Sequence, residues 1–475
     1  MQTPPPLPLN ESSPSRHQLG LWDVISLLIG IVVGVSIFRV PPLVFDRAGS
    51  PEMGLIVWGV GAFLALIGAM CYAELAATYP GFGAEYIYLG RAFGRPMSFL
   101  FGWMQTFIIL PGSVGAMAFV FATYASQFLP DRSGTQDALA GGAIALLCLL
   151  HLIGFQSGRR VQNLLTTIKV IALFGILVCG LILPVPERPA EANQAVQEAV
   201  NWTQLGLPLV LVLYSYGGWS DVAVVTADVR DCQRNMPRAL AIGLGLTAAL
   251  YLLLNLAYLR VLGYSGVCQS EAPAADVVER TLRLPAATGL MRVVVMISAL
   301  GAIHGMIFSG SRLLAAIGAD FPIFRRWNIW NRNHVPFWSV STVGGVSILM
   351  TAILGTVSGR TRLQTLLTWL HLPVPDWSQF GGSFDVFVAA SAPYFWIFFG
   401  MSGIALIRLR SRDRDRSRPF KVPGYPLTPL LFILTSAFML WSSLKYAGWL
   451  TLMMLPVLGL GILLAAIQRA PEKSE

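Results

Sequence analysis

The sequence predicts an all-α polytopic membrane protein, and three observations support this class. Of 475 residues, 55% are hydrophobic and only 12% are charged, about half the charged share of a soluble protein. Apolar runs long enough to cross a bilayer recur along almost the whole chain. Twelve helices of about 25 residues use about 300 residues, so no stretch remains that is long and polar enough for a soluble domain.

Twelve transmembrane helices are predicted, one on each apolar run, which leaves both chain ends on one side of the membrane. Residues 1–18 are rich in Pro and Ser and lack the basic segment and cleavage site of a signal peptide, so we predict a disordered tail. Residues 409–426 form a basic loop and 469–475 a second tail. The helices are expected at 20–45, 53–79, 97–129, 138–154, 162–184, 205–228, 237–262, 287–318, 336–357, 386–408, 427–446 and 448–468.

The basic residues predict the orientation. A net charge of +9 would suggest nucleic acid in a soluble protein, but basic residues in a membrane protein flank the cytoplasmic ends of its helices. With the N-terminus inside, twenty Lys and Arg residues fall on the cytoplasmic side and nine outside. We therefore expect cytoplasmic termini in a cell membrane, no nucleic-acid partner, and contact between the dense segment Arg408–Lys421 and lipid headgroups.

Enzyme and metal chemistry find no support in the sequence. The five cysteines are widely spaced and form no CxxC pair, so neither a disulfide framework nor a zinc site is expected. The sequence carries no HExxH, P-loop or nucleophile-elbow motif. We expect no catalytic residue, no cofactor and no metal.

Two predicted helices are interrupted by glycine, five helices apart. The first reads IGIVVGVSIF, with Gly30 and Gly34, and the sixth reads LYSYGGWSD, with Gly217 and Gly218. Such interruptions at matching positions point to a transporter binding site. A broken helix offers free N–H groups, which suit a carboxylate, and free C=O groups, which suit an ammonium. Together they fit an amino acid, although Gly30 and Gly34 alone also match a GxxxG packing face.

These motifs resemble the amino acid–polyamine–organocation superfamily, and most of all its L-type amino acid transporter family. The resemblance implies a LeuT-like fold with two inverted repeats of five helices, at 19–184 and 185–408, followed by two further helices at 427–468. The resembling stretches are IGIVVGVSIF, AELAATYPGFGAEYIYLGRAFG, WMQTFIILPGSVGAMA, YSYGGWSDVAVVTADVRDCQRNMPRAL and RPFKVPGYPLTPLLFI.

The sequence also departs from the family pattern. Gly34-Val35-Ser36 stands where the family has Gly-Ser-Gly, which adds side-chain bulk beside the expected carboxylate site. The loop at 358–385 is longer than expected. The loop PDRSGTQDALAGG lacks the Cys that joins human-type members to a glycoprotein, so no disulfide-linked heavy chain is expected.

The resemblance implies a set of substrate contacts. Tyr214 corresponds to an aromatic gate over the substrate, with a packing aromatic as its alternative. The backbone N–H groups of Val35, Ser36 and Ile37 would hold the substrate carboxylate. The backbone carbonyls of Tyr214, Ser215 and Gly217 would hold its ammonium. The side chains of Ile109, Ser298 and Trp396 would line the pocket.

Four further polar residues have a functional and a structural interpretation. Lys169 is the only Lys in an apolar run and corresponds to a residue that replaces the sodium ion of related transporters; alternatively it snorkels to the cytoplasmic surface. Glu74 and Glu85 are expected to be structural parts of the inner gate, with proton transfer as the functional alternative. His304, where relatives often have Asn, is expected to be a hydrogen-bonded core residue.

Asp221 stands where the family usually has an aromatic or apolar residue. A carboxylate inside a membrane is costly unless it is paired or wetted. His304 or another protein cation would make it structural, as would a position in the cytoplasmic vestibule beside Asp228. Otherwise the substrate brings the cation, and Asp221 selects cationic substrates.

The sequence thus predicts a secondary transporter that moves amino acids by alternating access without sodium, either as an exchanger or coupled to protons. A polyamine or cationic amine carrier is the alternative within transport. A sensor that binds an amino acid without moving it is the alternative from another class.

Overall fold

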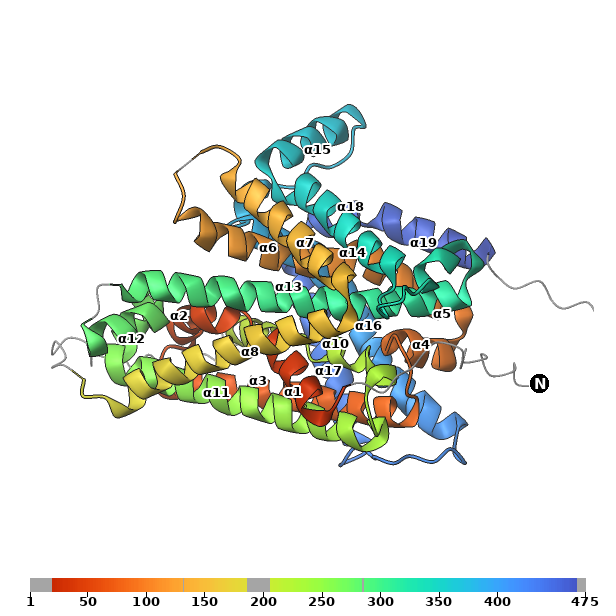
Figure 1. Ribbon diagram of the computed structural model, residues 1–475, viewed down its shortest axis with the longest axis horizontal. Helices are drawn as coiled ribbons and strands as arrows, with labels where there is room; N and C mark the ends of the chain where they lie inside the picture. Colours follow the sequence, from red (N-terminus) through yellow and green to blue (C-terminus); the bar gives the residue numbers. More distant parts are fainter. Residues whose placement is uncertain (1–18, 131, 186–205, 284–285, 468–475) are drawn as a thin grey trace, which may run out of the picture.

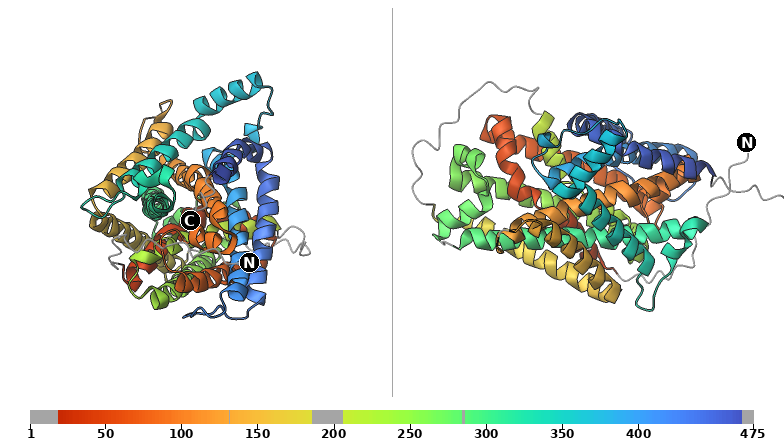
Figure 2. Two further views of the ribbon diagram at one scale, coloured as in Figure 1. Left: turned by 90° about the vertical axis from the view of Figure 1, so that its right-hand side faces the viewer. Right: turned by 90° about the horizontal axis from the view of Figure 1, so that it is seen from above.

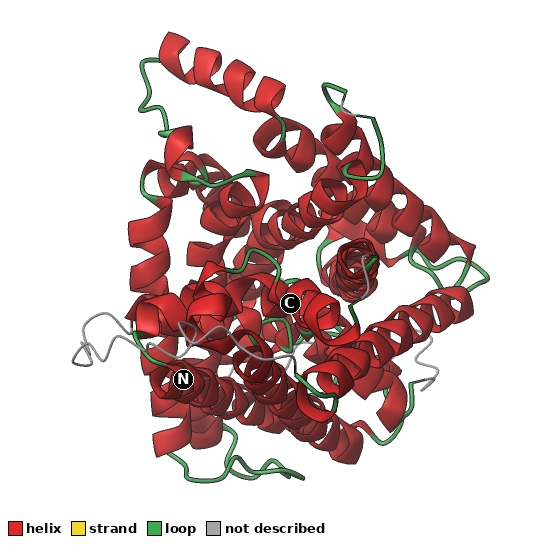
Figure 3. Cartoon of the chain, turned by 90° about the vertical axis from the view of Figure 1, so that its left-hand side faces the viewer, coloured by secondary structure: helices red, strands yellow, loops and turns green. Residues whose placement is uncertain are grey.

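The computed structural model describes residues 19–130, 132–185, 206–283 and 286–467 as a bundle of helices. In this part of the chain the only β contacts are three isolated bridges (Figure 3). The long helices run roughly along one axis (Figure 1), and Figure 2 shows the same bundle end-on and from above. The predicted tails at 1–18 and 469–475 lie outside the described residues, as do residues 186–205 at the start of the predicted second repeat.

The elements are mostly α-helical, with short π- and 3-10-helical turns between them. The α-helices are α1 Leu21–Val32, α2 Ser36–Ala48, α3 Pro51–Thr78, α4 Glu85–Phe93, α5 Arg95–Met104, α6 Leu110–Ser126, α7 Thr135–Ile153, α8 Phe155–Leu177, α9 Gly206–Ser215, α10 Ser220–Ala223, α11 Cys232–Gln269, α12 Pro273–Leu282, α13 Ala287–Asp320, α14 Phe337–Met350, α15 Val357–Trp369, α16 Ser383–Arg412, α17 Leu427–Ala447, α18 Trp449–Met453 and α19 Leu455–Ile467. The π-helices are η1 Gln105–Ile109, η2 Val178–Ile182 and η7 Thr351–Gly355, and the 3-10 helices are η5 Thr226–Asp228, η6 Pro322–Asn328 and η8 Trp377–Gln379.

Among the described residues, ten helical segments are long and apolar enough to cross a membrane, against the twelve predicted. The first predicted helix is the pair α1 and α2, which bend by 52° at a short break and count as an eleventh span if taken together. The sixth is split into α9, with ten residues, and α10, with four. The missing spans are therefore the two helices that the sequence analysis expected to be interrupted by glycine.

The predicted long loop at 358–385 contains a helix that no sequence pattern predicted. Helix α15 begins one residue after η7, where the Thr356 hydroxyl accepts a hydrogen bond from the Gly359 N–H at 2.9 Å. It projects from the bundle in Figures 1 and 2, and most of its side chains are exposed. Without a buried stripe, its sequence lacks the regular apolar spacing by which a packed helix is recognised.

Part of the predicted basic loop packs on the bundle through Glu74 of α3. The Glu74 carboxylate accepts hydrogen bonds from Arg410 Nε at 2.7 Å, from a second Arg410 nitrogen, and from the Val422 N–H at 2.7 Å. Arg418 Nε lies 3.5 Å from Glu74 Oε1. The Glu74 residue is only 1% exposed. This buried ion pair joins the end of α3 to the end of α16, consistent with the structural role expected for Glu74.

We predict that Glu74→Gln lowers the stability of the fold. The substitution keeps the shape but removes the charge, leaving two arginines around a neutral group, and breaking a buried pair in this way costs about 3 kcal/mol. Thermal unfolding of the purified protein in detergent should show a lower midpoint. Glu52→Gln, on the exposed face of the same helix, should unfold like the wild type; equal midpoints for all three proteins would contradict the prediction.

Candidate functional site

The first helix is interrupted between Val32 and Ser36. The Val33 N–H still bonds to the Ile29 carbonyl at 2.9 Å, but the Gly34 N–H turns back to the Val32 carbonyl at 2.7 Å, which ends α1. Helix α2 starts at Ser36 with Val35 as its N-cap residue. The first N–H groups of a helix have no partner within it. The N–H groups at Val35, Ser36 and Ile37 are therefore available to an anion at this end of α2.

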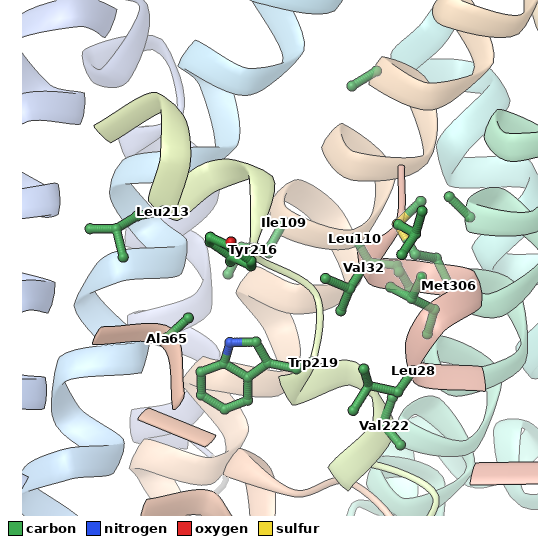
Figure 4. Packing of buried hydrophobic residues seen from close by; sticks show 14 of the residues in the cluster. Leu28, Val32, Ala65, Ile109, Leu110, Leu213, Tyr216, Trp219, Val222 and Met306 are labelled. Carbon is green, nitrogen blue, oxygen red and sulfur yellow. The ribbon is translucent and has the colours of Figure 1, made fainter. Parts of the chain in front are cut away.

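The second interruption lies between α9 and α10. The chain turns after Ser215 with a hydrogen bond from the Gly217 N–H to the Tyr214 carbonyl at 3.0 Å. Gly218 has φ of +96°, and a Cβ atom there would lie 2.8 Å from Ile31, so this position requires glycine. Figure 4 shows the unwound segment, with Tyr216 and Trp219 on it and Val32 of α1 nearby.

Tyr251 of α11 connects the two interruptions. Its hydroxyl lies 3.0 Å from the Val32 carbonyl oxygen and 3.4 Å from that of Ser215. Tyr251 is fully buried and packs edge-on against Trp58. One hydroxyl group thus contacts the last turn of α1 and the last turn of α9, which fixes the two broken ends next to each other.

Lys169 of α8 contacts the end of α1. Its ammonium donates hydrogen bonds to the Gly30 carbonyl at 2.9 Å and the Val33 carbonyl at 2.5 Å. The Ser298 hydroxyl donates to the same Val33 carbonyl at 3.1 Å. Lys169 is 0% exposed, so it does not snorkel to the surface. The ammonium instead satisfies carbonyl groups that the break leaves without helical partners.

The two interruptions open onto one cavity of about 150 Å³. One water molecule in the liquid takes up about 30 Å³, so the cavity has room for about five water-sized groups and can admit a small ligand. Figure 4 shows Val32, Leu213, Ile109 and Met306, which line it from four different elements. The lining residues are Ile31, Val32, Gly34, Val35, Ser36, Ile109, Ser113, Met117, Leu213, Tyr214, Ser215, Gly217, Gly218, Asp221, Ala302, Met306, Phe384, Ser391, Ala392, Phe395 and Trp396.

Most residues singled out from the sequence lie at this cavity. Those that line it are Gly34, Val35, Ser36, Ile109, Tyr214, Ser215, Gly217, Gly218, Asp221 and Trp396. Tyr214 also meets the ring of Phe384 edge-on at 6.2 Å. The side chains of Ile37 and Ser298 do not line the cavity, because Ile37 is buried in the core and Ser298 is engaged with Val33.

The two glycines of the first helix have different surroundings. A Cβ atom at Gly30 would lie 2.0 Å from the Gln162 side chain, so Gly30 allows α8 to pack closely against α1. At Gly34 the nearest atom would be the Val32 carbonyl oxygen at 3.8 Å, and the space beyond is the cavity. The packing interpretation therefore applies to Gly30 and the binding-site interpretation to Gly34.

Several cavity residues were not identified from the sequence, among them Met306, Phe384 and Phe395. Met306 and Phe395 are apolar residues within apolar segments, and nothing in their spacing separates a cavity wall from ordinary helix packing. Phe384 fell within the predicted loop at 358–385. Ser113 and Ser391 are polar residues in membrane spans, which is a weak signal of a cavity. Serine hydroxyls in helices commonly bond to carbonyls of their own helix, as these two do, so their presence alone does not distinguish a cavity from packing.

A smaller pocket adjoins the main cavity, with Asp221, Ile109 and Phe395 lining both. We call it the acidic side pocket. Its remaining lining residues are Glu85, Phe101, Gln105, Ser220, Phe398 and Phe399. The Tyr72 hydroxyl donates a hydrogen bond to Glu85 at 2.9 Å. Burial raises the pKa of Glu85 to about 8; hydrogen bonds from its own backbone and Tyr72 oppose this rise, and the nearby Asp221 carboxylate adds to it.

His304, the cation considered for Asp221, is engaged elsewhere, and so is Asp228, which was considered as its neighbour in the cytoplasmic vestibule. His304 is fully buried; its ring contacts Gln162 at 2.9 Å and stacks on His151 at 4.1 Å. This agrees with the hydrogen-bonded core histidine that was expected. Asp228 pairs with Arg312 at 3.1 Å. Among the described residues, the Asp221 carboxylate has no hydrogen-bond or ion-pair partner.

A bundle of apolar helices, two of them broken around a shared cavity, defines the molecule as a membrane transporter rather than an enzyme. The sequence profile of the amino acid permease family matches residues 19–460. The chain belongs to that family, and membership implies the LeuT-like fold. The resemblance drawn from the sequence motifs is thereby confirmed.

Characterised relatives align along most of the chain. The serine/threonine exchanger SteT of Bacillus subtilis is 26% identical over 434 residues, covering 91% of this chain and 92% of that protein. The human b(0,+)-type amino acid transporter 1 is 27% identical over 430 residues, covering 89% and 82%. The human large neutral amino acids transporter small subunit 2 is 28% identical over 442 residues, covering 90% and 76%.

Proposed function

We propose that this protein is a secondary transporter that carries amino acids across a membrane by alternating access. The observation that carries the proposal is the meeting of two helix interruptions at one cavity, with Tyr251 joined to both. The names of the relatives, a serine/threonine exchanger and amino acid transporters, support the same substrate class. Equilibrium binding tests the substrate class: amino acids should compete for one site, whereas binding of polyamines without binding of amino acids would favour the amine carrier.

The substrate's polar ends match the two interruptions. Its carboxylate binds the N–H groups at Val35, Ser36 and Ile37, where the dipole of α2 favours negative charge. Its ammonium binds carbonyls at the end of α9, from Tyr214, Ser215 and Gly217. Tyr214 and Phe384 close over it, since both line the cavity and contact one another. The side chain then points toward Ile109, Trp396 and Asp221.

Transport proceeds without sodium. The Lys169 ammonium lies against the Gly30 and Val33 carbonyls, and carbonyl oxygens at a broken helix are the ligands that a sodium ion would use. A fixed positive charge there leaves no need for a second cation. Exchange and proton coupling are both compatible with this arrangement.

Membership of the amino acid permease family supports a proposal for the full architecture. We place twelve transmembrane helices in the membrane, with α1 and α2 as the first and α9 and α10 as the sixth, in two inverted repeats of five followed by two more. The excess of basic residues puts both termini in the cytoplasm of a cell membrane. No disulfide-linked heavy chain is part of the assembly, because the loop after α6 has no cysteine.

Cysteine labelling should reveal this orientation. Ser133 and Ser417 are exposed serines on loops that we assign to opposite sides, so Ser133→Cys and Ser417→Cys are matched probes. In intact cells an impermeant thiol reagent should label the first above the wild-type background and not the second. Labelling of Ser417→Cys alone would invert the proposed topology.

A further inference from the structure

The acidic side pocket contains polar groups that the protein leaves unpaired. Ser220 is only 2% exposed, lines the pocket and makes no side-chain hydrogen bond to any described residue. The side chains of Gln105 and Asp221 also line it without a partner in the described chain. Buried polar groups are normally hydrogen-bonded. Three unpaired polar groups around one space indicate that something else binds there.

Two carboxyl groups, those of Glu85 and Asp221, line the pocket, and no cation among the described residues does. In the described structure, neither the side pocket nor the main cavity is lined by Lys, Arg or His. Lys169 is held by the end of α1, and His304 by Gln162. An unpaired carboxylate in a membrane interior is costly, so a cation from outside the protein would stabilise Asp221 in its charged form.

The size and walls of the pocket narrow the choice of cation. Its volume of about 10 Å³ corresponds to roughly one water-sized group, which suits an ammonium and is too small for a guanidinium. The phenylalanine rings of Phe395, Phe398 and Phe399 form its apolar walls. Aromatic faces attract cations, most strongly where water is excluded.

We propose that the transported amino acid carries a second ammonium on its side chain, as lysine and ornithine do, and that this group binds in the acidic side pocket between Asp221 and Glu85. The inference rests on the proposed function, because the α-amino and α-carboxylate groups bind at the two helix interruptions. The ammonium donates to the Asp221 carboxylate, with Ser220 and Gln105 as further acceptors. Arginine and neutral amino acids of the same length bind more weakly.

Lysine and norleucine provide the test, because they differ only by the terminal ammonium. Wild-type protein in detergent should bind lysine about ten- to a hundredfold more tightly than norleucine, the ratio expected for one charge-assisted hydrogen bond. Asp221→Asn should reduce lysine affinity by that factor and leave norleucine unchanged. Asp46→Asn, an exposed carboxylate outside the cavity, should behave like the wild type.

A second variant covers the case in which Asp221→Asn does not fold. Glu85→Gln keeps an oxygen for the Tyr72 hydroxyl and should weaken lysine binding more than norleucine binding. Equal wild-type affinities for lysine and norleucine would overturn the inference. So would variants in which the affinity for lysine and the affinity for norleucine fall by the same factor. If neutral amino acids bind and lysine does not, only the side-pocket assignment fails. If no amino acid binds at all, the proposed function fails with it.

Discussion

Replacing Lys169 with alanine should abolish transport while the protein still reaches the membrane. The ammonium contributes two hydrogen bonds to α1, each worth about 1.5–3 kcal/mol for a charged donor, and its loss leaves the Gly30 and Val33 carbonyls buried without it. Helix α8 would then no longer be tied to the broken end of α1. We expect uptake into proteoliposomes to fall at least tenfold, a factor that corresponds to about 1.4 kcal/mol.

Two comparisons show whether the ammonium itself is responsible. Lys169→Met keeps a long side chain without the charge and should fail as Lys169→Ala does. Lys445→Ala removes an exposed lysine that packs on Trp441 and should transport normally. Sodium-dependent uptake by the wild type, or normal uptake by Lys169→Ala, would show that Lys169 does not take the place of a sodium ion.

Filling the cavity from Gly34 should abolish substrate binding. A Cβ atom at Gly34 would lie no closer than 3.8 Å to its nearest neighbour, the Val32 carbonyl oxygen, and Gly34 lines the cavity. The side chain of Gly34→Leu should therefore occupy the space beside the N–H groups of α2. At Gly217 a Cβ atom would lie 3.1 Å from the Tyr214 carbonyl, so Gly217→Leu disturbs the end of α9. Thermal-shift titration should detect no ligand stabilisation in either variant.

Gly245 supplies the matched control for these substitutions. It lies exposed on α11, and a Cβ atom there would have no neighbour within 4 Å, so Gly245→Leu should fold and bind like the wild type. If Gly34→Leu and Gly217→Leu both retain wild-type affinity, the interruptions serve helix packing and the binding site lies elsewhere.

The sequence predicted those parts of the fold that local pattern determines. Apolar runs located the long helices, and paired glycines marked both interruptions, because a chain that leaves helical geometry inside a membrane needs residues such as Gly218. The position of Lys169 inside an apolar run favoured burial over snorkelling to the surface, and the structure decides for burial. The exposed helix α15 was missed, since a helix with little buried surface has no periodic apolar pattern.

The composition of the cavity depended on contacts between distant segments. Ser298 was expected to line the pocket, but its hydroxyl donates a hydrogen bond to the Val33 carbonyl, a contact that no local pattern reveals. Glu85 was expected only at the inner gate, whereas it shares a pocket with Asp221, 136 positions further along the chain. Such pairings are set by tertiary packing, which leaves no signal in the spacing of either residue.

Counterflow in proteoliposomes tests the central claim most directly. Vesicles that contain the purified protein are loaded with unlabelled amino acid in sodium-free buffer and diluted into a trace of the labelled compound, with lysine and leucine tested separately. If the protein is a sodium-independent amino acid transporter, label should accumulate transiently inside wild-type vesicles and not in those containing Lys169→Ala. Saturable binding without any accumulation of label would contradict transport and identify a sensor instead.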